Sequence, residues 1–244
     1  MYFKVVFENV NSDSDNFDLV VETANCTRWS AAKDWLSRTT AHVVLVQELH
    51  LVGDQVGEAS QWGLRVGWKS MIVPAAPGIG LGTSGGVGIF VRDFLGCHDV
   101  AAREGPVLVP HRAAPAGVQI PGEVSILVVS AYLKDSEGLS EFNRGVVWKI
   151  GAARSSCPGR FILGAVFQVE PAGLAEGDLV SVLCANLVVP ESQGTCAGTS
   201  KEERKREKAI KMTNKRRRVS VQLTYGVLST INFRHCHYYI SASV

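Results

Sequence analysis

The order of apolar and polar residues along the chain predicts many short strands and few helices. Val43–Val46 is an unbroken apolar run, rich in β-branched residues, and it ends on Gln47 and Glu48. Such a run is typical of a strand buried on both faces. The sequence therefore predicts a central strand over residues 41–48, with the Glu48 carboxylate at its exit. Strand ends are common sites in open sheets, but most Glu side chains are simply solvated, so both interpretations stay open here.

Similar patterns predict elements on either side of this strand. Two β-rich runs, 4–10 and 17–23, flank an Asn/Asp/Ser-rich loop and predict an antiparallel hairpin. Ser30 is the expected N-cap of a helix to Arg38, and the Gly/Pro-rich stretches 52–67 and 74–82 are predicted loops. A second helix is expected at 138–153, and its inward residues are Leu139, Phe142, Val146, Val147 and Ile150. Further strands are expected at 68–73, 84–92, 107–109, 113–120, 124–132, 161–164, 180–189, 219–228 and 231–241.

Composition agrees with a folded protein that buries a core. The chain has 244 residues, of which 46% are apolar and 20% charged, as is ordinary for a globular protein. No apolar run approaches the roughly 18 residues of a membrane span, and the first residues predict a strand rather than a signal peptide. Six scattered cysteines contain no Cys-x-x-Cys pair, so neither a zinc knuckle nor a disulfide framework is indicated. We expect an intracellular, reduced protein without a membrane partner.

Positive charge is concentrated in one segment. Lys201–Arg218 holds ten of the 25 Lys and Arg residues and three of the 23 Asp and Glu residues, a local balance of +7, against −5 elsewhere. Such a segment can bind nucleic acid, because phosphate contacts supply most non-specific affinity. It can equally be a nuclear-import signal or a solvated insert. The residues expected to contact nucleic acid are Lys205, Arg206, Lys215, Arg216, Arg217 and Arg218.

The glycines of Ser84–Arg92 allow two interpretations. They could form a loop that cradles a phosphate, or they could permit close packing beside a neighbouring strand. No Lys-Ser/Thr pair follows them, and the segment continues as a strand rather than a helix. Both observations favour close packing.

Ordered segments of the chain carry a resemblance to a known family. They are Thr23-Ala24-Asn25, Leu45-Val46-Gln47-Glu48, Ser84–Arg92, and Val128–Leu133 followed by a helix and Phe161–Gly164. Their order and spacing over residues 1–175 resemble the endonuclease/exonuclease/phosphatase (deoxyribonuclease I-like) superfamily, and the nuclease domains of non-LTR retrotransposons look most similar. The resemblance implies an α+β fold, a two-layer β-sandwich of mixed sheets with flanking helices. The predicted strands and helices agree with that arrangement.

The resemblance also implies a Mg²⁺-dependent phosphodiesterase site. In the family, the position of Glu48 supplies a metal ligand, that of Asn25 orients this ligand or the phosphate, and that of Tyr132 contacts the phosphate. An Asp-x-Asn motif after Phe161–Gly164 orients or deprotonates the attacking water, and Gln168 stands at its Asn position. Phosphodiester cleavage needs Mg²⁺, or Mn²⁺ in its place, to neutralise charge in the transition state, and Mg²⁺ takes few ligands from protein.

Two departures from the family pattern predict impaired catalysis. Val166 stands where the Asp of Asp-x-Asn is expected, and a Val side chain can neither accept a proton nor order a water. Loss of a general base costs a factor of about 10²–10⁴ in rate. The family's final Ser-Asp-His motif does not follow the last predicted strand. His235 and His237, on one face of that strand, are candidates for a substitute or a metal pair, with a structural role as the alternative.

Three functions agree with the sequence. The first is a divergent, catalytically impaired Mg²⁺-dependent phosphodiesterase or endonuclease domain that binds its metal weakly and acts on or binds nucleic acid. The second is an active phosphatase or phosphodiesterase with a rearranged site. The third is a non-enzymatic nucleic-acid-binding module that uses Lys201–Arg218. We predict one monomeric domain over residues 1–244, intracellular or nuclear, with a basic insertion at 198–219 that is either genuine or a retained intron.

Overall fold

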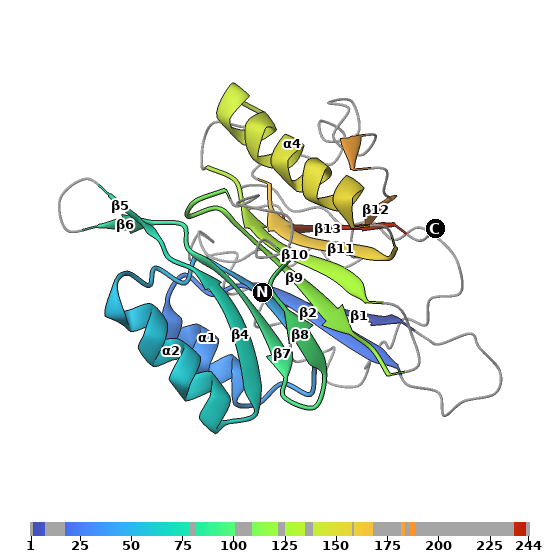
Figure 1. Cartoon of the computed structure of the whole chain (residues 1–244). Helices are drawn as coiled ribbons and strands as arrows, with labels where there is room; N and C mark the ends of the chain where they lie inside the picture. The colour runs from blue at the N-terminus through green and yellow to red at the C-terminus, as the bar shows by residue number, and fades with distance from the viewer. Residues whose placement is uncertain are drawn as a thin grey trace, which may run out of the picture.

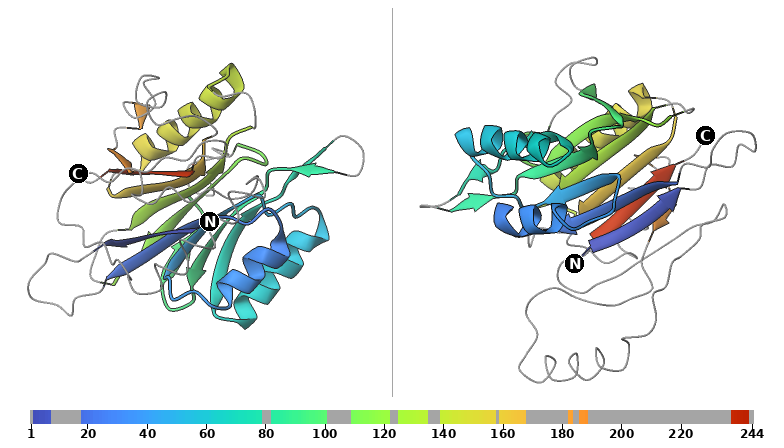
Figure 2. Two further views of the ribbon diagram at one scale, coloured as in Figure 1. Left: turned by 180° about the vertical axis from the view of Figure 1, so that it is seen from behind. Right: turned by 90° about the horizontal axis from the view of Figure 1, so that it is seen from below.

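Two β-sheets lie face to face, and helices cover their outer faces (Figure 1, Figure 2). The computed structural model describes residues 2–7, 18–78, 82–100, 109–121, 125–134, 139–157, 159–167, 182–183, 186–188 and 237–242. Within these residues the strands form mixed sheets with few helices. The predicted α+β sandwich is therefore confirmed.

The first sheet has five described strands in the order β1-β2-β3-β7-β4. β1 (Tyr2–Phe7) and β2 (Leu19–Asn25) are antiparallel, as the hairpin prediction required. β2 is parallel to β3 (Val43–Gln47). β7 (Val87–Arg92) runs antiparallel to both β3 and β4 (Trp68–Val73). The central strand predicted from the apolar run is thus β3, and all its residues are buried.

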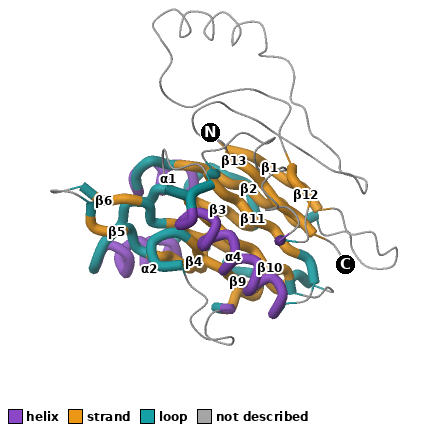
Figure 3. Tube along the Cα trace, turned by 90° about the horizontal axis from the view of Figure 1, so that it is seen from above, coloured by secondary structure: helices purple, strands orange, loops and turns teal. Residues whose placement is uncertain are grey.

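The second sheet has six described strands in the order β12-β13-β11-β10-β9-β8. Its central pair, β10 (Ile126–Tyr132) and β11 (Phe161–Val166), is parallel. Parallel neighbours need a crossover, which α4 (Glu141–Ser156) provides above the sheet (Figure 3). The other strands pair antiparallel and are β8 (Gly96–His98), β9 (Ala113–Gln119), β12 (Asn186–Val188) and β13 (His237–Ala242).

Helices on the outer faces complete the core. α1 (Trp29–Leu36) and α2 (Asp54–Arg65) pack on the first sheet, and α4 packs on the second (Figure 1). Because both faces of the central strands are covered, their sequences are continuously apolar rather than alternating. None of the described helices combines the length and apolar composition needed to cross a membrane. Between the sheets lies one apolar cluster that includes Leu19, Val21, Val43, Leu45, Val87, Ile89, Val128, Ile162 and Val166.

Two stretches predicted to be loops contain regular structure, so those predictions were wrong. α2 lies within 52–67. β5 (Ala76–Pro77) lies within 74–82 and pairs with β6 (Thr83–Ser84), and this short pair projects from the body in Figure 1. The glycines of α2 suggested a loop, but Gly63 serves close packing. A Cβ there would lie 3.2 Å from the Trp68 carbonyl oxygen, so glycine lets the helix approach β4.

Two details of the predicted helices were also wrong. α1 begins at Trp29 with Arg28 as its N-cap, so Ser30 lies inside the helix instead of capping it. Phe142 was expected to face inward, yet it is 50% exposed. Asn143 takes the buried position in this first turn, because its amide accepts from the Lys134 N–H at 2.8 Å and donates to the Lys134 carbonyl at 3.1 Å.

Several predicted strands lie wholly or partly outside the described residues. These are the predictions at 219–228, most of 107–109, half of 180–189, and the first part of 231–241. Within the last two ranges, β12 and β13 confirm strand structure, whereas residues 182 and 183 are in a helix and a turn.

Close contact between the sheets predicts an asymmetry between two glycines. A Cβ at Gly164 in β11 would lie 2.8 Å from Leu45 Cδ1 and 2.8 Å from Thr23 Oγ1, whereas a Cβ at Gly145 in α4 would meet nothing within 4 Å. We expect Gly164→Ala to lower the free energy of unfolding by about 1–3 kcal/mol through overpacking. Gly145→Ala, the matched control, should raise it by about 0.5–1 kcal/mol through helix propensity. Urea denaturation measures both; equal effects would contradict the inter-sheet contact.

Candidate functional site

The ends of four strands, two from each sheet, meet at one edge of the sandwich. Asn25 ends β2 and is in register with Gln47, the last residue of β3. Tyr132 ends β10 and is in register with Val166, the last residue of β11. Glu48 directly follows β3. We refer to the edge formed by Asn25, Glu48, Tyr132 and Val166 as the strand-end face.

Three residues of the strand-end face lie on the inner side of their sheet, toward the opposite sheet. Tyr132 and Val166 belong to the cluster between the sheets and are 4% and 0% exposed. Asn25 continues the inward series of Val21 and Thr23 at the two-residue period of a strand, and it is half-buried. The structure therefore brings together, from both sheets, positions that the sequence places far apart.

A buried amide joins the two sheets directly beneath this face. Gln47 Nε2 lies 3.0 Å from Ser130 Oγ and 3.2 Å from the Gly164 carbonyl oxygen, both in the second sheet. The same atom donates to Thr23 Oγ1 in the first sheet at 3.0 Å. The Thr23 and Ser130 hydroxyls donate in turn to backbone carbonyls of β3 at 2.9 Å. Because these side chains are fully buried and mutually bonded, they set the position of one sheet against the other.

Glu48 leaves β3 through a left-handed backbone conformation with a φ of 57°. This conformation costs a non-glycine residue about 1–2 kcal/mol. The chain after Glu48 is held in place because Leu49 N donates to the Gly86 carbonyl at 3.0 Å. Glu48 is half-buried rather than fully solvated. Strained backbone therefore holds the half-buried Glu48 at the exit of β3.

The glycines opposite Glu48 serve close packing, which resolves the two interpretations of Ser84–Arg92. A Cβ at Gly88 would lie 2.8 Å from Leu49 Cδ1, and a Cβ at Gly85 would lie 2.7 Å from the His111 carbonyl oxygen. Gly85 also has a φ of 77°, which other residues rarely adopt. The segment is therefore a tightly packed strand entry and not a phosphate cradle.

Asn25 presents a hydrogen-bond donor at the exit of β2. Its Oδ1 accepts from the Thr27 N–H at 3.1 Å, and a backbone N–H can only donate, so the amide group of Asn25 carries Nδ2 on its other side. The next residue, Cys26, donates its N–H to the Gln47 carbonyl at 3.1 Å and ties this exit to that of β3. Nδ2 can donate to an anion such as a carboxylate or phosphate oxygen.

Arg112 lies beside Tyr132 and was missed in the sequence. It is 6% exposed, and its guanidinium carbon lies 5.4 Å from the centroid of the Tyr132 ring. Its Nη2 donates to Ser84 Oγ at 3.0 Å, and its carbonyl accepts from the Tyr132 N–H at 2.8 Å. The available signal was a lone Arg at the start of an apolar strand. Its pairing with Tyr132 could not be read from that signal, because it depends on the register of β9 and β10.

The ligands of the strand-end face suit only a loosely bound metal. Among the described residues, no group of three or more His, Cys, Asp or Glu side chains could hold an ion. Of the four residues that define the face, Glu48 alone carries a carboxylate. Mg²⁺ commonly binds through one or two carboxylates and keeps several waters. The four residues of the face therefore offer a divalent cation one carboxylate, that of Glu48.

Other predicted site residues fall outside the described part of the chain. They are Gln168, His235 and the basic residues Lys205, Arg206, Lys215, Arg216, Arg217 and Arg218. His237 is described as the first residue of β13, and its backbone is in register with Val166.

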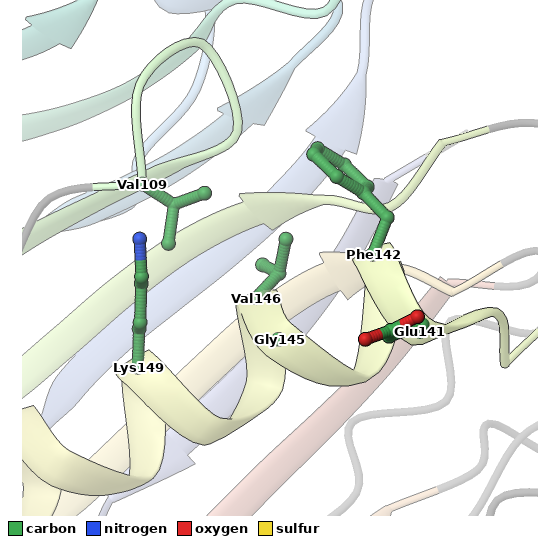
Figure 4. A pocket seen from close by; sticks show the side chains of 6 residues that line it. All are labelled: Val109, Glu141, Phe142, Gly145, Val146 and Lys149. Carbon is green, nitrogen blue, oxygen red and sulfur yellow. The ribbon is translucent and has the colours of Figure 1, made fainter.

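A separate cleft lies between α4 and the turn at Val109 (Figure 4). It has a volume of about 420 Å³. Phe142, Val146 and Lys149 extend from α4 toward Val109, and Glu141 and Gly145 complete the lining. None of the catalytic, metal-binding or nucleic-acid-binding residues predicted from the sequence is among the residues that line this cleft. Its lining is mainly apolar and includes two charged side chains, Glu141 and Lys149.

The inter-sheet amide predicts a specific loss of stability. Gln47→Leu removes the donor to Ser130 Oγ and to the Gly164 carbonyl, and we expect the free energy of unfolding to fall by about 1–3 kcal/mol. Gln61→Leu makes the same change on the exposed side of α2 and should stay within about 0.5 kcal/mol of the wild type. Urea denaturation measures both variants. Similar losses at the two positions would show that the amide does not stabilise the sandwich.

Comparison with known proteins identifies the fold. No protein-family model matches the chain, and no curated protein matches its sequence. The AP endonuclease LMAP from Leishmania major superposes with a TM-score of 0.52 at 14% identity, over 91% of this chain and 86% of that chain.

Two further solved structures are less similar. Beta toxin from Staphylococcus aureus superposes with a TM-score of 0.47 at 10% identity, over 90% of this chain and 83% of its own. ANGEL2, a 2′,3′-cyclic phosphatase, has a TM-score of 0.45 at 12% identity, over 61% of this chain and 45% of its own. At these identities a likeness establishes the fold alone. The superposition with the AP endonuclease confirms that the chain has the deoxyribonuclease I-like fold of the endonuclease/exonuclease/phosphatase superfamily.

Proposed function

We propose that this chain is a divergent Mg²⁺-dependent phosphodiesterase-type domain that binds nucleic acid at the strand-end face and hydrolyses it poorly or not at all. One observation carries the proposal. The positions that correspond to the family's Asn, Glu, Tyr and first Asp meet at one edge, but the Asp position is a fully buried Val166. This arrangement supports a role in holding a phosphate, and Val166 offers no group that could activate water at its position.

The residues of the face have distinct roles in this proposal. Glu48 holds the metal, with water as the remaining ligands, and Asn25 Nδ2 orients the carboxylate or a phosphate oxygen. The Tyr132 hydroxyl contacts the phosphate, and the Arg112 guanidinium beside its ring adds positive charge. A bound Mg²⁺ would neutralise charge on the phosphodiester. Each of these roles concerns binding and orientation, which Val166 does not impair.

In this proposal, the chain lacks the proton transfer that activates the attacking water. The Val166 side chain is 0% exposed and packs among apolar residues between the sheets, so no water is ordered or deprotonated there. Gln168, at the family's Asn position, keeps an amide but cannot act as a base at neutral pH. Without a general base the rate falls by a factor of about 10²–10⁴.

Nucleic acid is the proposed ligand class for two reasons. The fold is shared with an AP endonuclease. In addition, Lys201–Arg218 is strongly basic in a chain that is otherwise mildly acidic. We propose that Lys205, Arg206, Lys215, Arg216, Arg217 and Arg218 supply non-specific phosphate contacts, while the strand-end face holds one phosphodiester. A nuclear location would agree with such a ligand.

Restoring the missing groups tests the proposal. In plasmid nicking with Mg²⁺ we expect no robust cleavage by the wild type and measurable cleavage by Val166→Asp with Gln168→Asn. Val166→Asn with Gln168→Asn is the matched control, because its side chains have the same size but provide no proton acceptor. The control should stay inactive, and Glu48→Ala in the active double variant should abolish the gain. Robust wild-type cleavage that is lost in Glu48→Ala would contradict impairment and favour an active, rearranged site.

A binding readout accompanies the activity assay. A carboxylate at position 166 would be buried, so Val166→Asp should lower the melting temperature in the absence of metal. Added Mg²⁺ should then raise the melting temperature of this variant more than that of the wild type, because a ligand that binds the native state stabilises it. An unchanged response to Mg²⁺ would show that position 166 does not face a metal.

The basic segment makes a separate prediction. Replacing Lys215, Arg216, Arg217 and Arg218 with Gln should weaken binding to a labelled DNA duplex and lower the salt slope of log K by about 0.9 for each lost contact. The control removes the same number of exposed cations from the described helices and their flanks: Arg28, Lys33, Arg144 and Lys149. Fluorescence anisotropy at several salt concentrations measures both. Equal slopes for the two variants would assign the affinity to net charge alone.

A further inference from the structure

Residues with a strained backbone gather beside Glu48 of the strand-end face. Glu48, His50 and His111 have φ angles of 57°, 55° and 66°, although none is glycine. Backbone N–H groups of the segment after Glu48 donate to the carbonyls of Gly85 and Gly86 at 3.3 and 3.0 Å. Gly86 N donates in turn to the His111 carbonyl at 3.0 Å. His111 is therefore linked through Gly86 to the segment that carries Glu48, and such clustered strain points to function.

The His111 ring has a fixed orientation. Its Nδ1 lies 2.9 Å from the Pro74 carbonyl oxygen. A carbonyl oxygen only accepts, so Nδ1 carries a hydrogen and the ring cannot turn without losing this bond. Nε2 lies on the opposite side of the ring. When the imidazole is protonated, Nε2–H becomes a second donor with a set direction, as in oriented functional histidines.

The surroundings of His111 suit an anion. Arg112 follows it in the turn, and its guanidinium lies over the Tyr132 ring. The neighbouring segments also carry Glu48 and His50, and the His50 Nδ1 lies 3.0 Å from Thr83 Oγ1. Glu48 is an acidic group in this neighbourhood, and it is the proposed metal ligand. A phosphodiester would bring negative charge to a place where Arg112, His111 and a cation held by Glu48 could meet it.

We propose that His111 is a phosphate-binding residue of the strand-end face. Its protonated imidazole donates from Nδ1 to Pro74 and from Nε2 to a non-bridging oxygen of a nucleic-acid phosphodiester. This inference rests on the proposed function and assigns it a specific cationic contact. It also gives a reason for a histidine at position 111, where the left-handed backbone conformation would strain glycine or asparagine less.

NMR of the full chain labelled with ¹⁵N-histidine tests the proposal, with the dinucleotide pTpT as probe. The few phosphates of pTpT limit non-specific binding to Lys201–Arg218. We expect pTpT to move the Nε2 resonance of His111 toward the protonated position. His111→Asn should lose that resonance and bind pTpT about tenfold more weakly, the effect of one charged hydrogen bond. Its melting temperature should be unchanged or higher, because Asn tolerates the left-handed conformation.

His98→Asn is the matched control, since His98 lies in β8 and packs over Gly117 instead of facing the strand ends. It should bind pTpT like the wild type. If His111→Asn fails to fold, His111→Gly replaces it, because glycine removes the strain altogether. An unmoved His111 resonance, or equal affinity in the wild type and the His111 variant, overturns this inference alone. Absence of any pTpT binding by the wild type overturns the proposed function as well.

Discussion

One buried amide links the two halves of the candidate site. The strand-end face takes Asn25 and Glu48 from the first sheet and Tyr132 and Val166 from the second, so its geometry depends on how the sheets are aligned. Apolar contacts between sheets have little directionality, because the hydrophobic effect scales with buried area. The hydrogen bonds of Gln47 to Ser130 and Gly164 are directional, and misalignment would leave fully buried polar groups without partners. Glycine at 164 is part of the same constraint, because a Cβ there would collide with the first sheet.

In the proposed function, the strand-end face above this polar layer binds a phosphate but does not transfer a proton. The exits of β2 and β3 are connected by the hydrogen bond from Cys26 N to the Gln47 carbonyl, and they present the Asn25 amide and the carboxylate of Glu48, whose backbone is strained. In the second sheet, β10 ends in Tyr132 beside the buried Arg112, but β11 ends in the buried Val166. In the proposal, both sheets contribute electrostatic contacts to a phosphate. A base at position 166 is absent, which is why the proposed function is binding with little turnover.

Charge acts on two length scales in this proposal. The net charge of +7 on Lys201–Arg218 would act over a Debye length of about 10 Å and attract any polyanion. Arg112 and His111 would act at hydrogen-bond distance, where orientation matters. His111 is held by Pro74, and Arg112 by Ser84, so neither side chain needs to reorganise when an anion arrives. The long-range contribution is sensitive to salt, and the short-range contribution depends on the left-handed turn that places His111.

Local pattern was enough to predict the central strands and the polar residues at their ends. β3, β10 and β11 are short apolar runs, and burial on both faces leaves that signature in the sequence itself. The ordered motifs also predicted the sandwich and four positions of the face. The remaining features depend on contacts between distant residues. α2 was predicted to be a loop because of its glycines, although Gly63 is there to let the helix pack closely against Trp68. Arg112 and His111 were missed because only strand register brings them beside Tyr132 and Gly86. The Gln47–Gly164 bond spans 117 residues, and no local pattern encodes a hydrogen bond whose partners meet only when two sheets pack.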